Sequence, residues 1–121
     1  MAATATILFA HGARDPDWAR PFRQLALELA ERLPGERVAL AFLELMQPSL
    51  GECVAALHAE GIQKFRVVPV FLGSGGHLKI DLPRLVAEVK DKLKNVEIDL
   101  EPPVGEQPEV ISAIARAIAA R

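Results

Sequence analysis

The chain has 121 residues, of which 50% are hydrophobic and 25% charged, and its formal net charge at pH 7 is -2. This length predicts one domain, residues 1–121, with a core of its own, because folding at this size buries roughly two thirds of the surface of the unfolded chain. The basic residues are dispersed among acids, no apolar run reaches the ~18 residues of a membrane span, and Cys53 is the only cysteine. These features argue against nucleic acid or a membrane as partner, exclude an internal disulfide, and predict a cytoplasmic protein.

The first half of the chain alternates strand and helix patterns. Residues 5–10 form an apolar run that predicts a strand, and residues 37–43, rich in Val, Leu and Phe, predict a second one. Between them, apolar residues three or four positions apart predict an amphipathic helix that Pro34 and Gly35 end. The spacing of Ser49 and Glu52 is that of a capping box, which predicts a helix that Gly61 closes.

The second half continues this alternation. Residues 65–72 predict a third strand, residues 82–93 a third helix, and residues 96–100 alternate as a half-exposed edge strand would. A proline-containing loop follows at residues 101–107. The last predicted helix begins at Pro108, and its apolar residues are Val110, Ile111, Ile114 and Ile118.

Four strands alternating with four helices predict a three-layer α/β/α sandwich with a parallel sheet and right-handed crossovers. The strand order 2-1-3-4 is favoured, because it places the first and third strands side by side at the switch point where ligands bind. Pro69 is at odds with a central strand, since proline cannot donate to a ladder. We therefore expect a local defect in the ladder near Pro69.

Two histidines follow predicted strands in similar positions. His11 comes directly after the first strand, and His77 follows the third strand and a glycine-rich turn, so both should lie at the carboxyl ends of neighbouring strands. Such strands are about 4.8 Å apart, and imidazoles on them can converge on one metal ion. Glu44 ends the second strand and would add a carboxylate. Because a closed structural zinc site needs four protein ligands, we interpret these three residues as an open, exchangeable metal site.

Each of these residues also has a purely structural alternative. A histidine after a strand is often a turn residue hydrogen-bonded to the backbone, and Glu44 could cap a helix. His58, in the last turn of the second predicted helix, is interpreted as structural, because a positive side chain interacts well with a helix C-terminus. Cys53 and Trp18 are interpreted as packing residues.

A glycine-rich turn and several cations flank the two histidines. Gly73, Gly75 and Gly76 surround Ser74, and their amides could approach a ligand closely. Neither the Walker spacing nor GxGxxG is present. The cations are Arg14, Lys79 and Arg84, which would suit an anionic substrate such as a polycarboxylate; solvated surface charges are the alternative.

These motifs resemble the small CbiX-type chelatases of the class II tetrapyrrole chelatase family, which insert a divalent metal into sirohydrochlorin. The resemblance covers nearly the whole chain and rests on three blocks: residues 8–16 (LFAHGARDP), residues 42–44 followed by 48–50 (FLE, PSL), and residues 68–72 leading to 75–77 and 81–83 (VPVFL, GGH, DLP). Ala13 stands where the first motif usually has serine, so a hydroxyl contact made by that serine is absent here.

The resemblance implies roles for these residues and for the chain. His11 and His77 would bind the metal and assist removal of the pyrrole protons, and Glu44 would contact metal or substrate. No nucleotide is consumed in the family, cobalt is the usual metal, iron and nickel serve relatives, and short members pair as homodimers. The tetrapyrrole would be contacted by Arg14, Glu44, Leu72, Gly73, Ser74, Gly75 and Gly76.

Two rival functions remain open at the level of sequence. A non-enzymatic metal carrier or sensor would bind metal through His11 and His77 and would need no affinity for a tetrapyrrole. A histidine phosphatase also uses a histidine after its first strand, but its signature has arginine directly before His-Gly, where this chain has Ala10.

Overall fold

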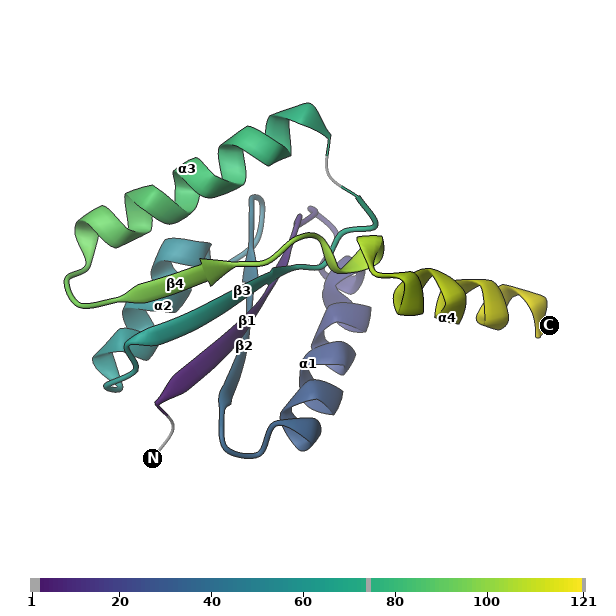
Figure 1. Ribbon diagram of the computed structural model, residues 1–121, viewed down its shortest axis with the longest axis horizontal. Coiled ribbons are helices and arrows are strands. Elements are labelled where there is room, and N and C mark those ends of the chain that lie inside the picture. The colour runs from purple at the N-terminus through teal and green to yellow at the C-terminus, as the bar shows by residue number, and fades with distance from the viewer. Residues whose placement is uncertain (1–2, 74, 121) are drawn as a thin grey trace.

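The computed structural model describes residues 3–73 and 75–120 and shows a four-stranded parallel sheet with helices on both sides (Figure 1). The strand order is β2-β1-β3-β4, so the predicted α/β class, parallel sheet and order are confirmed. The strands are β1 (Thr4–Ala10), β2 (Arg37–Phe42), β3 (Lys64–Pro69) and β4 (Glu97–Leu100). The helices are α1 (Arg20–Arg32), α2 (Leu50–Ala59), α3 (Gly76–Lys92) and α4 (Pro108–Ala119), with the 3-10 turns η1 (Pro16–Ala19) and η2 (Val104–Glu106).

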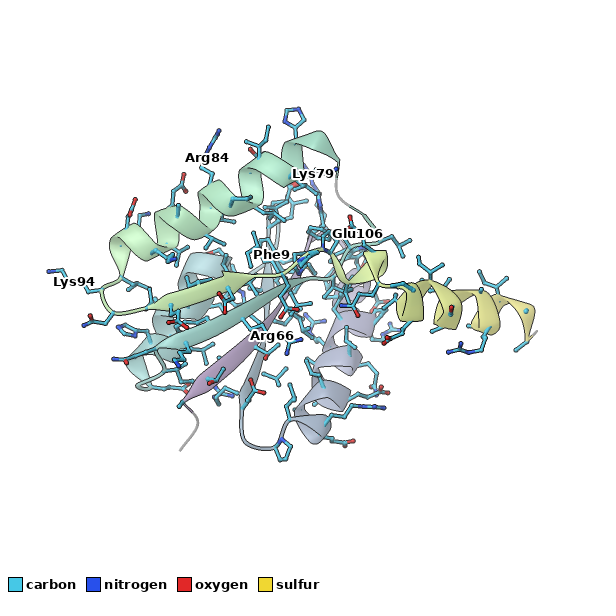
Figure 2. The ribbon with its side chains drawn as sticks, viewed as in Figure 1. Phe9, Arg66, Lys79, Arg84, Lys94 and Glu106 are labelled. Carbon is cyan, nitrogen blue, oxygen red and sulfur yellow. The ribbon has the colours of Figure 1, made fainter. Side chains whose placement is uncertain are left out.

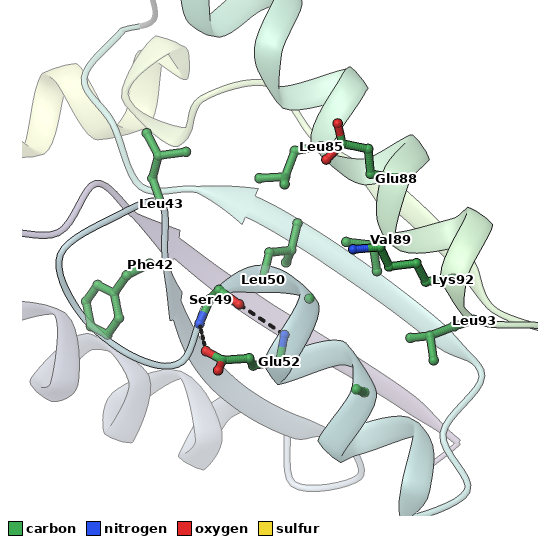
Figure 3. A pocket seen from close by; sticks show the side chains of 12 residues that line it. Phe42, Leu43, Ser49, Leu50, Glu52, Leu85, Glu88, Val89, Lys92 and Leu93 are labelled. Atoms are coloured by element: carbon green, nitrogen blue, oxygen red, sulfur yellow. Dashed lines mark hydrogen bonds between the residues drawn. The ribbon is translucent and has the colours of Figure 1, made fainter.

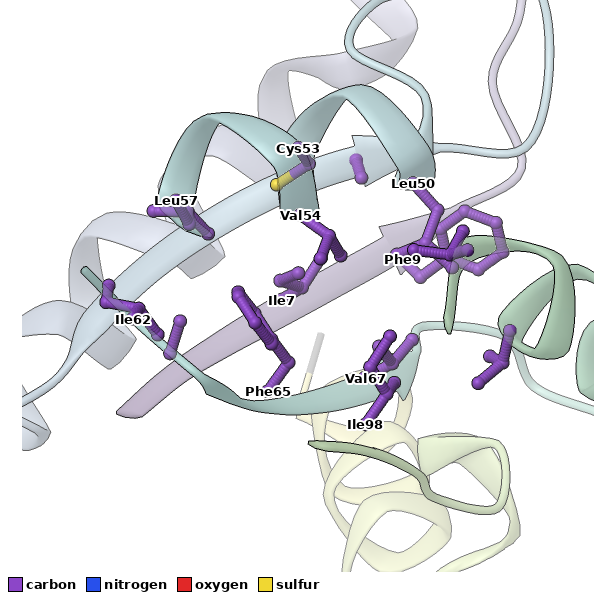
Figure 4. Close-up of a cluster of buried hydrophobic side chains, with 14 of the residues drawn as sticks. Ile7, Phe9, Leu50, Cys53, Val54, Leu57, Ile62, Phe65, Val67 and Ile98 are labelled. Carbon is purple, nitrogen blue, oxygen red and sulfur yellow. The ribbon is translucent and has the colours of Figure 1, made fainter. Parts of the chain in front are cut away.

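The main hydrophobic core lies between the sheet and the pair α2 and α3 (Figure 4). Ile7 and Phe9 of β1 and Val67 of β3 point to this side and are fully buried, together with Val54 of α2. Burying a side chain of this size contributes about 1.5–3 kcal/mol relative to leaving it exposed. This side of the sheet therefore holds the carboxyl ends of β1 and β3 in place.

The opposite side of the sheet is covered more thinly. α1 packs there, and Phe42 belongs to a smaller cluster with residues of β1 and η1. Every residue of α1 and α4 is described, and none of them is buried. α4 extends away from the body in Figure 1, and Ile111, Ile114 and Ile118 on it are exposed. The apolar stripe of the last helix thus does not join the core of its own chain.

Local signals in the sequence act as predicted at several element ends. Ser49 Oγ accepts a hydrogen bond from the Glu52 amide at 3.2 Å, and the Glu52 carboxylate accepts from the Ser49 amide at 2.8 Å, which confirms the capping box. Gly61 follows α2 with a φ of +101°, a conformation that glycine adopts without steric cost. Pro21 lies in the first turn of α1, where a missing amide hydrogen costs nothing. No helix in the described part of the chain combines the length and apolar character needed to cross a bilayer.

The ladder defect expected at Pro69 lies on the β4 side of β3, where the pairing ends before the proline. The Val70 amide still donates to the Phe9 carbonyl of β1 at 2.8 Å, so the backbone of the preceding residue faces away from β1, towards β4. The pairing of β3 with β4 stops at Val67 and Leu100, before Pro69 is reached. Proline is tolerated in this inner strand because no β4 residue is paired with it. β3 ends at this proline, three residues earlier than predicted.

Candidate active site

The carboxyl ends of β1 and β2 bring His11 and Glu44 together. The two strands pair in register up to Ala10 and Phe42. Beyond the strands two backbone hydrogen bonds keep the chains together: the Leu43 amide donates to the Ala10 carbonyl at 2.9 Å and the Glu44 amide to the His11 carbonyl at 3.1 Å. His11 Nε2 and Glu44 Oε2 are 3.4 Å apart as a result. Two residues separated by more than thirty positions in the chain thus form one pair of polar groups.

Gly12 makes this close approach sterically feasible. Its φ is +101°, and a Cβ built on it would lie 1.9 Å from the Glu44 carbonyl oxygen. A backbone oxygen cannot rotate away as a side chain can, so any larger residue would force β1 and β2 apart at this point. The glycine after His11 is therefore required by the register of the sheet, and the turn itself sets the distance between the imidazole and the carboxylate.

The geometry of the His11–Glu44 pair is compatible with an ion pair and also with a bound metal ion. Both side chains are about half exposed, at 50% and 53%, so their direct attraction is weak. Among the described residues, neither side chain takes part in any of the hydrogen bonds found. Two ligand atoms at bond lengths of roughly 2.1 Å and a tetrahedral angle are themselves about 3.4 Å apart, which equals the observed separation. With the imidazole neutral, both groups could therefore offer a lone pair to one ion.

Phe71 supports the His11 ring from the neighbouring strand end. The two rings meet edge to face, with centroids 6.4 Å apart and an interplanar angle of 62°, and Phe71 also packs against Phe9 at 6.5 Å. Edge-to-face contacts of this kind restrict the orientation of a ring. Sequence reasoning treated Phe71 only as a strand residue; its aromatic character at the end of β3, next to a predicted site, was the available signal.

His77 reaches the same end of the sheet from α3. It is exposed and lies in the first turn of that helix, which begins after the glycine-rich turn. Within residues 3–73 and 75–120, no group of three or more His, Cys, Asp or Glu side chains is gathered closely enough to hold a metal ion. The structure therefore brings together His11 and Glu44 of the predicted trio, and the participation of His77 stays a prediction. Ser74, which was predicted to contact substrate, lies outside the described residues.

Large apolar side chains are exposed around the strand ends. Leu45 follows Glu44, Leu72 follows β3, and Ile80 lies in the first half of α3; their exposed fractions are 59%, 68% and 61%. Leu45 also has a φ of +66°, an unusual conformation for a residue with a side chain that typically costs about 1–3 kcal/mol. Of the three, only Leu72 was predicted as a substrate contact. All three come soon after the carboxyl end of a strand, in or before the following helix.

The predicted cations differ in their placement. Arg14, Lys79 and Arg84 are all exposed. In Figure 2, Lys79 lies near the start of α3, at the strand-end side, whereas Arg84 points outward from the same helix. Arg14 lies in the turn between β1 and η1, three residues after His11. Arg14 and Lys79 are therefore better placed than Arg84 to meet an anionic group at the strand ends.

A largely apolar groove lies away from the His11–Glu44 pair, between two helices. It has a volume of about 460 Å³ and runs between α2 and α3, where Leu43, Leu50, Leu85 and Val89 line it (Figure 3). Neither His11 nor His77 contributes to it, and it carries no metal-ligating cluster. The His11–Glu44 pair and the positive φ of Leu45 lie at the strand ends and not in this groove.

The residues interpreted as structural have structural roles. His58 Nδ1 lies 3.0 Å from the Ile62 carbonyl oxygen, and because a carbonyl only accepts, this nitrogen donates. Burial raises the pKa of the Cys53 thiol to about 11, so it stays protonated and unreactive near neutral pH. Trp18 stacks on Phe22 with ring centroids 4.6 Å apart. These three predictions are confirmed.

A comparison with protein families identifies the family of the chain. The sequence profile of the CbiX family matches residues 5–121, almost the full length. The chain belongs to the CbiX family. It is 32% identical over 107 residues to the sirohydrochlorin cobaltochelatase of Saccharolobus solfataricus, a match that covers 82% of this chain and 80% of that protein.

Solved structures in and near the CbiX family share the fold. A CbiX protein from Marinobacter aquaeolei superposes with a TM-score of 0.87 at 33% identity, covering 97% of this chain and 95% of that one. The sirohydrochlorin chelatase SirB from Bacillus subtilis, in complex with cobalt, superposes with a TM-score of 0.78 at 26% identity. That match covers 99% of this chain and 51% of SirB, so this CbiX chain corresponds to about half of SirB.

Proposed function

We propose that this CbiX chain inserts a divalent metal ion into sirohydrochlorin. The observation that carries the proposal is the 3.4 Å separation of His11 Nε2 and Glu44 Oε2, two half-exposed groups that can act as metal ligands. A carboxylate and an imidazole bind a divalent ion, and an exposed site can release it again. The names of the relatives, sirohydrochlorin cobaltochelatase and sirohydrochlorin chelatase, support the choice of substrate.

Different residues would bind the ring face, the carboxylates and the metal ion. The flat, apolar face of a tetrapyrrole would rest on Leu45, Leu72 and Ile80, with the amides of Gly73, Gly75 and Gly76 beside it. Its carboxylates would meet Arg14 and Lys79. The ion, held by His11, Glu44 and His77, would then face the ring nitrogens.

Metal insertion needs two proton acceptors. When the ion M²⁺ passes to the ring nitrogens, the two pyrrole N–H groups lose their protons, and the ring leaves with the metal in place of them. The groups that release the ion regain free lone pairs at the same moment. His11 and His77 would therefore serve first as ligands and then as bases, and the two protons finally pass to solvent. The exchange of one ion for two protons balances without a nucleotide, and we propose that none is consumed.

The insertion reaction can be tested directly. Sirohydrochlorin is incubated under anaerobic conditions with Co²⁺, Fe²⁺ or Ni²⁺ in turn, and its absorbance spectrum is followed against a control without protein. We expect protein-dependent insertion, fastest with cobalt, which is the metal we propose. Binding of Co²⁺ without any change in the spectrum of added sirohydrochlorin would instead indicate a metal carrier or sensor.

We propose further that the protein is a homodimer in the cytoplasm. The exposed stripe of Ile111, Ile114 and Ile118 on α4 supports a dimer, because a 12-residue helix without tertiary contacts is marginal in water. SirB, of which this chain matches half, also supports it. The single, buried Cys53 fits a reducing compartment.

Light scattering tests the dimer. We expect twice the chain mass of 13.1 kDa for the wild type, and the single mass for Ile114→Lys. Ser112→Lys is the matched control, since Ser112 is exposed about 200° around α4 from Ile114. A wild-type protein with full activity and only the 13.1 kDa mass would refute the dimer.

A further inference from the structure

We infer that Gly105 is a positioning residue for the active site. Because it has no side chain, its backbone can pack directly against the segment that follows β3, and this contact keeps Phe71 against the His11 ring. This inference rests on the proposed function for its catalytic consequence. Its structural basis is independent of that function.

Gly105 packs closely against the backbone of the residues that follow β3. It lies in η2, is buried, and donates its amide hydrogen to the Phe71 carbonyl at 2.9 Å. A Cβ on Gly105 would lie 2.3 Å from Leu72 Cα, 2.5 Å from the Phe71 carbonyl oxygen and 2.6 Å from the Leu72 carbonyl oxygen. All three are backbone atoms, which no rotamer change can remove. Any side chain at position 105 would therefore push η2 and the end of β3 apart.

The hydrogen bond of Gly105 completes an interrupted ladder. On the β4 side of β3, the Glu101 amide donates to the Val67 carbonyl at 2.9 Å, and the next such bond is that of Gly105 to Phe71. Between them Pro69 has no amide hydrogen to offer, so the chain can arch away through Pro102 and Pro103 and return at Gly105. The hydrogen bond from Gly105 therefore fixes the position of Phe71, which lies beyond the residues where β3 pairs with β4.

Phe71 links the Gly105 hydrogen bond to the His11 ring. Its carbonyl is held by Gly105, while its ring meets the His11 imidazole edge to face, with centroids 6.4 Å apart. On its other side, the Val70 amide donates to the Phe9 carbonyl in β1, the strand that carries His11. A displacement of Phe71 would thus change the surroundings of the His11 ring. Groups that orient a metal ligand typically contribute 10- to 100-fold in metal affinity or activity.

The first test reads the His11 ring itself, without metal or substrate. Imidazole proton and nitrogen signals are compared by NMR among wild type, Gly105→Ala and Gly35→Ala, with the His11 signals assigned from His11→Ala. Gly35 is the matched control, since a Cβ there meets nothing within 4 Å. We expect Gly105→Ala to move the His11 signals and to leave those of His58, which is bound to Ile62, in place. Unmoved His11 signals in folded Gly105→Ala would overturn the inference.

The second test separates positioning from a general loss of stability. Co²⁺ affinity and kcat/KM are measured at a temperature where circular dichroism shows every variant folded. We expect Gly105→Ala to lose about 10- to 100-fold in either quantity and Gly35→Ala to match the wild type. A lowered Tm with unchanged affinity and kcat/KM would overturn the inference. If the wild type shows no insertion activity, the proposed function fails, while the NMR comparison still decides the role of Gly105.

A third variant covers the case in which Gly105→Ala does not fold. Phe71→Leu keeps an apolar side chain but removes the ring edge from His11, so it should move the His11 signals in the same way. Where both variants fold, the double variant should lose no more Co²⁺ affinity than Phe71→Leu alone, because Gly105 acts through Phe71. Fully additive losses, or His11 signals that Phe71→Leu does not move, would contradict the proposed path.

Discussion

The turn after β1 and the segment after β3 each carry one histidine, but they hold it in different ways. His11 is tied to β2 by the hydrogen bond from the Glu44 amide, and Gly12 is wedged against the Glu44 carbonyl. His77 lies in the first turn of α3, whose first flanking residue, Gly75, has no side chain with which to cap the helix. The first histidine is therefore placed by the sheet, and the second by a helix that begins in a glycine-rich turn.

If both histidines belong to one site, as we propose, this difference suggests a division of roles between them. The His11–Glu44 pair is already close in the structure and would receive the ion there. His77, exposed in the first turn of α3, would join the pair when substrate binds. The predictions below test whether both histidines are needed and how far the His11–Glu44 pair depends on its backbone.

The largest effect is expected from removing either histidine. His11→Ala and His77→Ala should each reduce metal insertion by about 10²- to 10⁴-fold, the range typical of an acid–base group, or by more, because each would also remove a proposed metal ligand. The assay is the change in the sirohydrochlorin spectrum with Co²⁺, with circular dichroism to show that the variants are folded. If folded His77→Ala inserts cobalt at the wild-type rate, the site is built on β1 and β2 alone.

A smaller but substantial loss is expected from Gly12→Ala. The added Cβ would lie 1.9 Å from the Glu44 carbonyl oxygen and would require an alanine at a φ of +101°, so β1 and β2 must separate at the site. Misplacing a reacting group by about 1 Å can cost 10²-fold in rate. Insertion rate and Tm should both fall, whereas Gly35→Ala should preserve the rate. Wild-type activity in Gly12→Ala would show that the His11–Glu44 distance is not critical.

Acidification should weaken the reaction more gradually. Protons and metal compete for the same imidazole lone pairs, so kcat/KM should decrease as the pH falls from 8 to 5. Raising the Co²⁺ concentration should shift this decrease to lower pH. A rate that does not vary over this range would remove both histidines from the mechanism.

The smallest effect is expected at His58, which serves as the comparison for the other two histidines. His58→Ala loses one hydrogen bond to the Ile62 carbonyl, which should lower the free energy of unfolding by about 0.5–1.5 kcal/mol. Insertion activity should remain close to that of the wild type. Urea unfolding and the cobalt assay measure the two quantities, and a tenfold loss of activity would contradict a purely structural role.

The sequence alone determined the fold class and was enough to place His11 and Glu44 on neighbouring strand ends. Period-two and period-3.6 patterns depend only on which side chains are apolar, so strands and helices could be assigned from residue order. The capping box of Ser49 and Glu52 is equally local. The strand order followed from the rule that ligand-bearing strand ends meet at a switch point, which placed His11 and Glu44 on adjacent strands.

Only the tertiary structure decided how these pieces touch. Three contacts depend on segments that lie more than thirty positions apart in the sequence. They are the 3.4 Å separation of His11 and Glu44, the close approach of Gly12 to Glu44, and the Gly105–Phe71 hydrogen bond. A pattern of apolar residues shows that a surface avoids water, but not which surface it meets. For the same reason the stripe on α4 predicted a helix correctly and gave no sign that this helix would leave the body of its own chain.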